Sequence, residues 1–147
     1  MSYLWLLALM AGAAIATQAS MNASLGVMLK SSLIGTAIAF MLSGLLTLVA
    51  VLISTKQYPQ IEVIKLVPLY LWFTGSFLSA FGVAVFYYLI PKMGVGPMMT
   101  YALAGQILIA MLTSHFGWFG LPIKPINAVK IAGLAALIVG ILLINRE

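Results

Sequence analysis

The chain has 147 residues, of which 64% are hydrophobic and only 6% are charged. A soluble domain carries roughly a quarter charged residues, so this composition excludes a water-exposed surface and predicts an integral membrane protein. Seven Lys and Arg against two acidic residues give a net charge of +5, but these charges occur singly. Scattered charges are typical of loop ends facing phospholipid headgroups, and they exclude a basic patch suited to nucleic acid. The absence of Cys excludes disulfides, thiolate metal sites and a cysteine nucleophile.

Five apolar runs are long enough to predict transmembrane helices, because a spanning helix needs about 20 mostly apolar residues. In chain order we expect helices over residues 3–29, 33–54, 66–91, 96–115 and 128–145. The first run has no basic segment before it, so we interpret it as a membrane helix and not as a cleaved signal peptide. The predicted fold is therefore an all-α integral membrane protein, with residues 1–147 forming a single transmembrane domain.

The expected helices are separated by segments with the composition of loops and turns. A polar loop over residues 56–65 contains Pro59 and Glu62. Residues 92–97 form a short turn, and a loop rich in Gly, Pro and aromatic residues follows residue 116. Gly and Pro are the strongest turn signals, which supports these boundaries.

Positive charges are almost equally divided between the two sides of this five-helix topology. The N-terminal side has four and the other side has three, namely Lys56, Lys65, Lys124 and Lys130 against Lys30, Lys92 and Arg146. The positive-inside rule then gives two interpretations that are about evenly matched. One is a modest preference for a cytoplasmic N-terminus. The other is dual topology, in which copies inserted both ways pair antiparallel and build from two chains the inverted repeat of many transporters.

Three amide side chains lie within the expected spans. Gln18 lies just past the middle of the first helix, Asn22 follows one turn later on the same face, and Gln106 lies near the middle of the fourth helix. A buried amide without a partner costs several kcal/mol in hydrocarbon, so these groups need a polar partner. Either they bind a small polar substrate in a central cavity, or they hydrogen-bond one another between helices. The adjacent pair Gln18 and Asn22 slightly favours the substrate site.

Small and aromatic residues alternate at helical spacing in the second and third helices. The members of this pattern are Phe40, Gly44 and Thr47, then Trp72, Gly75, Ser79, Gly82 and Phe86. Close helix packing needs the same small residues and is the favoured interpretation, but we also assign Phe40, Trp72 and Ser79 to the wall of a substrate cavity. In the last helix, Ala132, Ala136 and Gly140 form a ridge of small residues. We expect the dimer contact at that ridge.

Most catalytic chemistry is missing from the spans. The chain has no Asp, and both Glu residues lie outside the expected helices. A buried carboxylate that exchanges protons against a cationic drug is therefore excluded. We find no nucleophile–base pair, metal cluster or phosphate-binding loop, so we expect neither an enzyme nor a cofactor. His115 at the end of the fourth helix is favoured as an interfacial anchor over a proton carrier, and Lys30 and Lys92 as snorkelling loop residues.

The segment over residues 12–26, GAAIATQASMNASLG, resembles the helix-one signature of the YdcZ-like family. Further matches follow in the same order along the chain, at Phe40, Gly44, Gly75, Pro91, Lys92, Gly94, Gly105, Gln106 and His115–Gly117. Members of the YdcZ-like family are small five-span proteins of the bacterial inner membrane, grouped with the drug/metabolite transporter superfamily. The resemblance implies a half-size transporter that is completed by antiparallel dimerisation.

Two positions depart from the family pattern. Ser114 stands where members often carry an acidic residue before the histidine, which weakens a role for His115 in ion coupling. Residues 79–82 read Ser-Ala-Phe-Gly where a Gly start and a Tyr end are expected, so a cavity hydroxyl is lost.

The leading hypothesis is an alternating-access exporter of a small organic metabolite or toxic compound, acting as a homodimer in the lipid bilayer. Pairing with a different protein of opposite orientation is the alternative to the homodimer. The alternatives from other classes are a small dual-topology ion channel, which also uses neutral polar groups, and a non-transporting accessory subunit.

Overall fold

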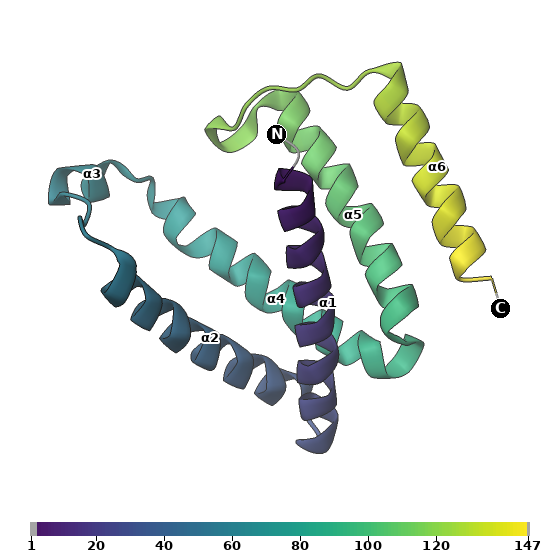
Figure 1. The fold of residues 1–147 in the computed structure, drawn as a ribbon, viewed down its shortest axis with the longest axis horizontal. Coiled ribbons are helices and arrows are strands. Elements are labelled where there is room, and N and C mark those ends of the chain that lie inside the picture. Colours follow the sequence, from purple (N-terminus) through teal and green to yellow (C-terminus); the bar gives the residue numbers. More distant parts are fainter. Residues whose placement is uncertain (1–2, 147) are drawn as a thin grey trace. The chain divides into compact units, whose positions relative to one another are not determined.

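The computed structural model describes residues 3–146, and helix accounts for 84% of it with no strand among those residues. The chain divides after Lys92 into two compact units, residues 1–92 and 93–147. The first unit contains four helices, α1 (Leu4–Met28), α2 (Ser32–Ser54), α3 (Ile61–Leu66) and α4 (Leu69–Met93) (Figure 1). The second contains α5 (Val95–Phe116), the 3₁₀ turn η1 (Trp118–Gly120) and α6 (Ala128–Ile144).

Four of these helices, α1, α2, α4 and α5, are long and apolar enough to cross a membrane. The shortest, α5, has 22 residues, and would rise about 33 Å, slightly more than the roughly 30 Å hydrocarbon core. Longer helices fit such a core by tilting. The apolar helix α6 has 17 residues and would rise about 26 Å. The described chain is therefore an all-helical membrane protein with four candidate spans and one shorter apolar helix.

The segment between α2 and α4 differs from the expected polar loop and helix over 66–91. Part of it is helical, as α3, and the long helix begins only at Leu69. Pro68 explains the break, since a residue before proline is pushed out of the helical region, and Val67 is extended with ψ 121°. At the other end, α4 continues through Pro91 to Met93 and stops before Gly94, whose φ is 88°. A positive φ is a common helix terminator.

The α1–α2 hairpin is built around a close approach of two glycines. Gly26 and Gly35 are both buried. A Cβ atom added at Gly35 would lie 3.0 Å from the Cα of Gly26 and 3.2 Å from the carbonyl oxygen of Asn22. The two backbones therefore pack without room for a methyl group at this crossing.

The turn between α1 and α2 closes the hairpin through backbone hydrogen bonds. The N–H groups of Lys30 and Ser31 donate to the carbonyls of Val27 and Gly26 at 3.0 and 2.9 Å. The Ser31 hydroxyl accepts from the Ile34 N–H at 3.3 Å and caps α2. Lys30 adopts φ 54°, a left-handed conformation that costs a residue with a Cβ roughly 1–2 kcal/mol.

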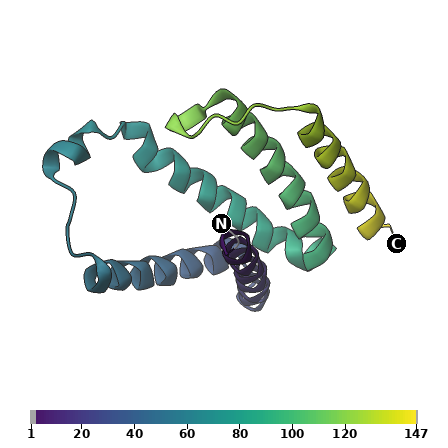
Figure 2. The ribbon, with the colours of Figure 1, turned by 45° about the horizontal axis from the view of Figure 1, so that its top comes forward.

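In the second unit, α5 and α6 lie side by side and run in opposite directions, as both ribbon views show (Figure 2). Their connection is held to the end of α5, where the Lys124 N–H donates to the Ser114 carbonyl at 2.8 Å. Near the other end, the Asn145 side-chain N–H donates to the Thr100 hydroxyl at 2.9 Å. These bonds fix the α5–α6 pair at both ends.

Candidate functional site

Three polar side chains of the first unit form a closed hydrogen-bonded cluster between α1 and α4. The Asn22 Nδ2 group donates to Gln18 Oε1 at 2.7 Å and to Tyr87 Oη at 2.9 Å. The Tyr87 hydroxyl donates in turn to Gln18 Oε1 at 3.1 Å. We call Gln18, Asn22 and Tyr87 the polar cluster.

Helix geometry explains why these residues meet. Gln18 and Asn22 are four residues apart, so they lie one above the other on one face of α1. Asn22 lies six residues before Met28, the last residue of α1, and Tyr87 lies six residues before Met93, the last residue of α4. Each is therefore about 9 Å from the C-terminal end of its own helix. Tyr87 is 2% exposed, so its long side chain brings a buried hydroxyl to the amides.

The cluster leaves part of its hydrogen-bonding capacity unused. Both N–H groups of Asn22 Nδ2 donate hydrogen bonds within the cluster, and the Tyr87 hydroxyl both donates and accepts. Within residues 3–146, the Gln18 Nε2 group and the Asn22 Oδ1 atom have no hydrogen-bond partner. Two donors and one acceptor therefore remain for another molecule.

The polar cluster opens onto a groove of about 420 Å³ whose other lining residues are mostly apolar. Phe40 and Ser43 of α2 line this groove together with Gln18 and Asn22. Phe40 also lines a second groove of about 480 Å³, where it faces Gly75, Ser76 and Ser79 of α4. No residue lining either groove carries a formal charge. The arrangement suits a small molecule with an uncharged polar group and an apolar body.

The hydroxyl groups of Ser and Thr in the same helices behave differently from the amides. Thr17, Ser20, Thr47 and Thr74 each donate to the carbonyl four residues earlier in their own helix. This is the usual way in which hydroxyls are satisfied away from water. The polar cluster differs because it joins α1 to α4.

Residues 3–143 match the model of the family described as “Putative inner membrane exporter, YdcZ”. The chain belongs to the YdcZ family. The resemblance in the first helix is thus confirmed, and the protein is a multi-pass inner-membrane protein of a family of exporters. No curated protein and no solved structure matches the chain.

Some of the expected site residues of this YdcZ protein lie together, and others do not. Gln18, Asn22 and Phe40 line one groove, and Phe40 and Ser79 line the next. Trp72 lies on α4 with 51% of its surface exposed and lines neither groove. Gln106 is exposed on α5 of the second unit, and its place in the binding site stays a prediction.

The residue that the sequence did not assign to the site is Tyr87. Tyr87 lies near the end of the expected span over residues 66–91, where a tyrosine is usually an interfacial anchor. A phenol has a polar tip on an apolar ring, so it can reach an amide on a neighbouring helix. The sequence signal that could have suggested this role is the position of Tyr87, one turn inside the expected span over residues 66–91.

The ridge proposed for dimerisation and the terminal histidine both lie in the second unit. Ala132 and Ala136 are exposed on α6, and a Cβ added at Gly140 would meet nothing within 4 Å. His115 Nδ1 accepts a hydrogen bond from the Ile126 N–H at 3.1 Å. His115 thereby anchors the connection to α6 at the end of α5, in keeping with a structural role.

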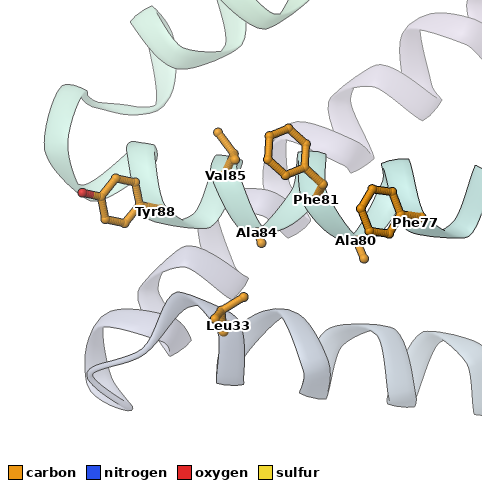
Figure 3. A pocket seen from close by; sticks show the side chains of 7 residues that line it. All are labelled: Leu33, Phe77, Ala80, Phe81, Ala84, Val85 and Tyr88. Carbon is orange, nitrogen blue, oxygen red and sulfur yellow. The ribbon is translucent and has the colours of Figure 1, made fainter.

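A further groove of about 450 Å³ lies between the start of α2 and the outer face of α4. Leu33 points toward α4, where Ala84 faces it, and Phe81 and Phe77 extend the same surface (Figure 3). The hydroxyl of Tyr88 is the only side-chain polar group of its lining residues. This surface suits lipid chains or another apolar helix and lacks the polar groups of a substrate site.

Proposed function

We propose that this YdcZ protein exports a small, uncharged organic molecule that binds the polar cluster. The observation that carries the proposal is the unused hydrogen-bonding capacity of Gln18 and Asn22 beside an apolar groove. Amides that served only to join helices would have no reason to face a groove of about 420 Å³. The family's description as an exporter supports the direction of transport.

The chemistry of the groove favours neutral substrates. The Gln18 Nε2 donors and the Asn22 Oδ1 acceptor match a carbonyl, amide or hydroxyl group on the substrate. Phe40 offers an aromatic face to the apolar part of the molecule. An ion bound here would lose its water without meeting an opposite charge, which is costly in a medium of low polarity.

We propose further that α6 is a fifth span and that two copies pair antiparallel with dual topology. A helix of 17 residues is at the lower limit for a span, and a thin or tilted local bilayer accommodates it. The near-equal division of positive charge supports insertion in both orientations. In this dimer the exposed Ala132 and Ala136, with Gly140, form the contact between copies, and alternating access occurs about the two-fold axis.

An export assay in living cells tests the proposed site. The chain is expressed in a bacterial strain that lacks its major efflux pumps, and growth is measured against a panel of toxic organic compounds. We expect protection against at least one uncharged compound, and loss of that protection in Gln18→Ala and Asn22→Ala at equal membrane levels. Gln57→Ala is the matched control, because Gln57 is an exposed amide in the loop after α2.

Full protection by both site variants would remove the polar cluster from the transport pathway. Purified protein in liposomes then separates a carrier from a channel. A carrier gives a flux of the protective compound that saturates with concentration, whereas unitary electrical currents would contradict the proposal.

Reporters fused to the C-terminus test the topology. Dual topology predicts that a periplasmic reporter and a cytoplasmic reporter are both active on the same chain. Activity of one reporter alone would overturn the antiparallel homodimer. The export proposal does not depend on this result and is tested by the growth assay.

A further inference from the structure

A second polar pocket in the first unit lies where α1 ends, α2 begins and α4 ends. Its volume is about 200 Å³, and it is lined by Lys30, Ser31 and Ser32 from the hairpin and by Tyr87, Tyr88 and Lys92 from α4. It therefore combines two cationic side chains from elements more than 60 residues apart in the sequence, Lys30 and Lys92. We call it the basic pocket.

The positive charge of the basic pocket is not neutralised by the helices around it. Lys92 Nζ donates to the Tyr88 hydroxyl and lies 3.9 Å from the centre of that ring. Both contacts leave its charge in place. Glu62 is the only acidic residue of the first 92 and belongs to α3. That helix follows the opposite end of α2, which rises about 34 Å over its length (Figure 1).

Neutral hydrogen-bond donors border the same pocket. Within residues 3–146, the backbone N–H group of Ser32, in the first turn of α2, has no hydrogen-bond partner. The Tyr88 hydroxyl accepts from Lys92, so its own hydrogen is free to donate. N–H groups at the start of a helix, with the positive end of its dipole, favour an anion beside the two lysines.

The backbone of Lys30 adds a separate indication. Its φ of 54° lies in the left-handed region, where glycine is the usual residue at a helix C-terminus. A lysine in this position is strained, and a strained residue at a polar pocket points to use of its side chain. The left-handed turn is what places the Lys30 side chain at the pocket formed with Lys92.

We propose that the basic pocket binds a phosphate group. Two lysines, serine and tyrosine hydroxyls and a free helix N–H group are donors from which phosphate oxygens accept hydrogen bonds. The space of about 200 Å³ is large enough to hold a phosphate with part of its ester. Helix ends lie at headgroup depth, so an anionic phospholipid is one source of this group and free phosphate is the other.

Binding is tested on the full chain in neutral detergent by the shift of its thermal unfolding temperature. The two probes are dihexanoyl phosphatidylglycerol and inorganic phosphate, and dihexanoyl phosphatidylcholine is the zwitterionic comparison lipid with the same acyl chains. The variants are Lys30→Gly, which removes the charge and relieves the strained backbone, and Lys92→Gln. Lys65→Gln on the exposed helix α3 is the control for loss of one positive charge.

We expect at least one of the two probes, phosphatidylglycerol or inorganic phosphate, to raise the unfolding temperature of the wild type and of Lys65→Gln by the same amount. In Lys30→Gly and Lys92→Gln the apparent affinity falls at least tenfold, while Lys30→Gly without the probe is as stable as the wild type or more so. A shift with phosphatidylglycerol alone assigns the pocket to a lipid headgroup, and a shift with inorganic phosphate assigns it to the free anion. No shift, or an equal loss in all three variants, would overturn the proposal.

Discussion

The hydroxyl of Tyr87 offers the sharpest test of the polar cluster. Tyr87→Phe keeps the buried ring and removes one oxygen, which accepts from Asn22 and donates to Gln18. The bond between Gln18 and Asn22 at 2.7 Å is left intact. Two hydrogen bonds between α1 and α4 are therefore lost with almost no change in packing.

The expected cost follows from measured interhelical hydrogen bonds in membranes, which average about 0.6 kcal/mol each. Two such bonds give about 1.2 kcal/mol, or roughly an eightfold change in the folding equilibrium constant. Without the Tyr87 hydroxyl, only their mutual hydrogen bond orients Gln18 and Asn22 at the groove, so we also expect weaker export of a compound that binds there. The free energy of unfolding is measured by titrating detergent-purified protein with a denaturing detergent.

Tyr70→Phe is the matched control. Tyr70 lies on the same helix and is 50% exposed, and within residues 3–146 its hydroxyl has no hydrogen-bond partner. If the free energies of unfolding of Tyr87→Phe and Tyr70→Phe differed by less than about 0.3 kcal/mol, half of one such bond, the hydroxyl of Tyr87 would not hold the cluster together. The assignment of Tyr87 to the site would then fail.

Two further predictions use the same purified protein. Gly35→Ala should lower the free energy of unfolding by about 1–3 kcal/mol, because the new methyl group meets the Cα of Gly26 at 3.0 Å. Gly44→Ala on the same helix meets nothing within 4 Å and should be neutral or slightly stabilising; equal effects would contradict the close approach. His115→Ala should speed hydrogen exchange at the Ile126 amide about fivefold, the equivalent of about 1 kcal/mol for the lost bond, and an unchanged rate would show that the histidine does not hold this loop.

The basic pocket and the polar cluster share one residue. Tyr87 lines both the basic pocket and the groove of the polar cluster. Its hydroxyl belongs to the cluster, whereas the charged groups of the basic pocket come from the helix ends. Variants at Lys30 leave the hydrogen bonds of Tyr87 in place, so the two proposals are tested separately.

The local sequence was sufficient for the class of the protein and for its family. Apolar runs of more than 20 residues with few charges require lipid, because no water-facing surface can be made from them. The pairing of Gln18 with Asn22 also follows from the sequence, because residues four apart share a helix face. Local patterns were less informative at Pro68 and Pro91, where only the backbone shows that one proline breaks a helix and the other lies within its last turn.

The tertiary structure decided which distant groups complete these local pairs. Tyr87 is 65 residues from Asn22, and nothing in the spacing of either helix indicates that their side chains meet, because that depends on how α1 and α4 cross. The same holds for Lys30 and Lys92, which the sequence places in separate loops and which line one pocket in the structure. Helical periodicity is a property of neighbouring residues, whereas a binding site depends on how separate helices cross, and close contacts between helices, such as Gly26 of α1 against Gly35 of α2, are a property of the tertiary structure.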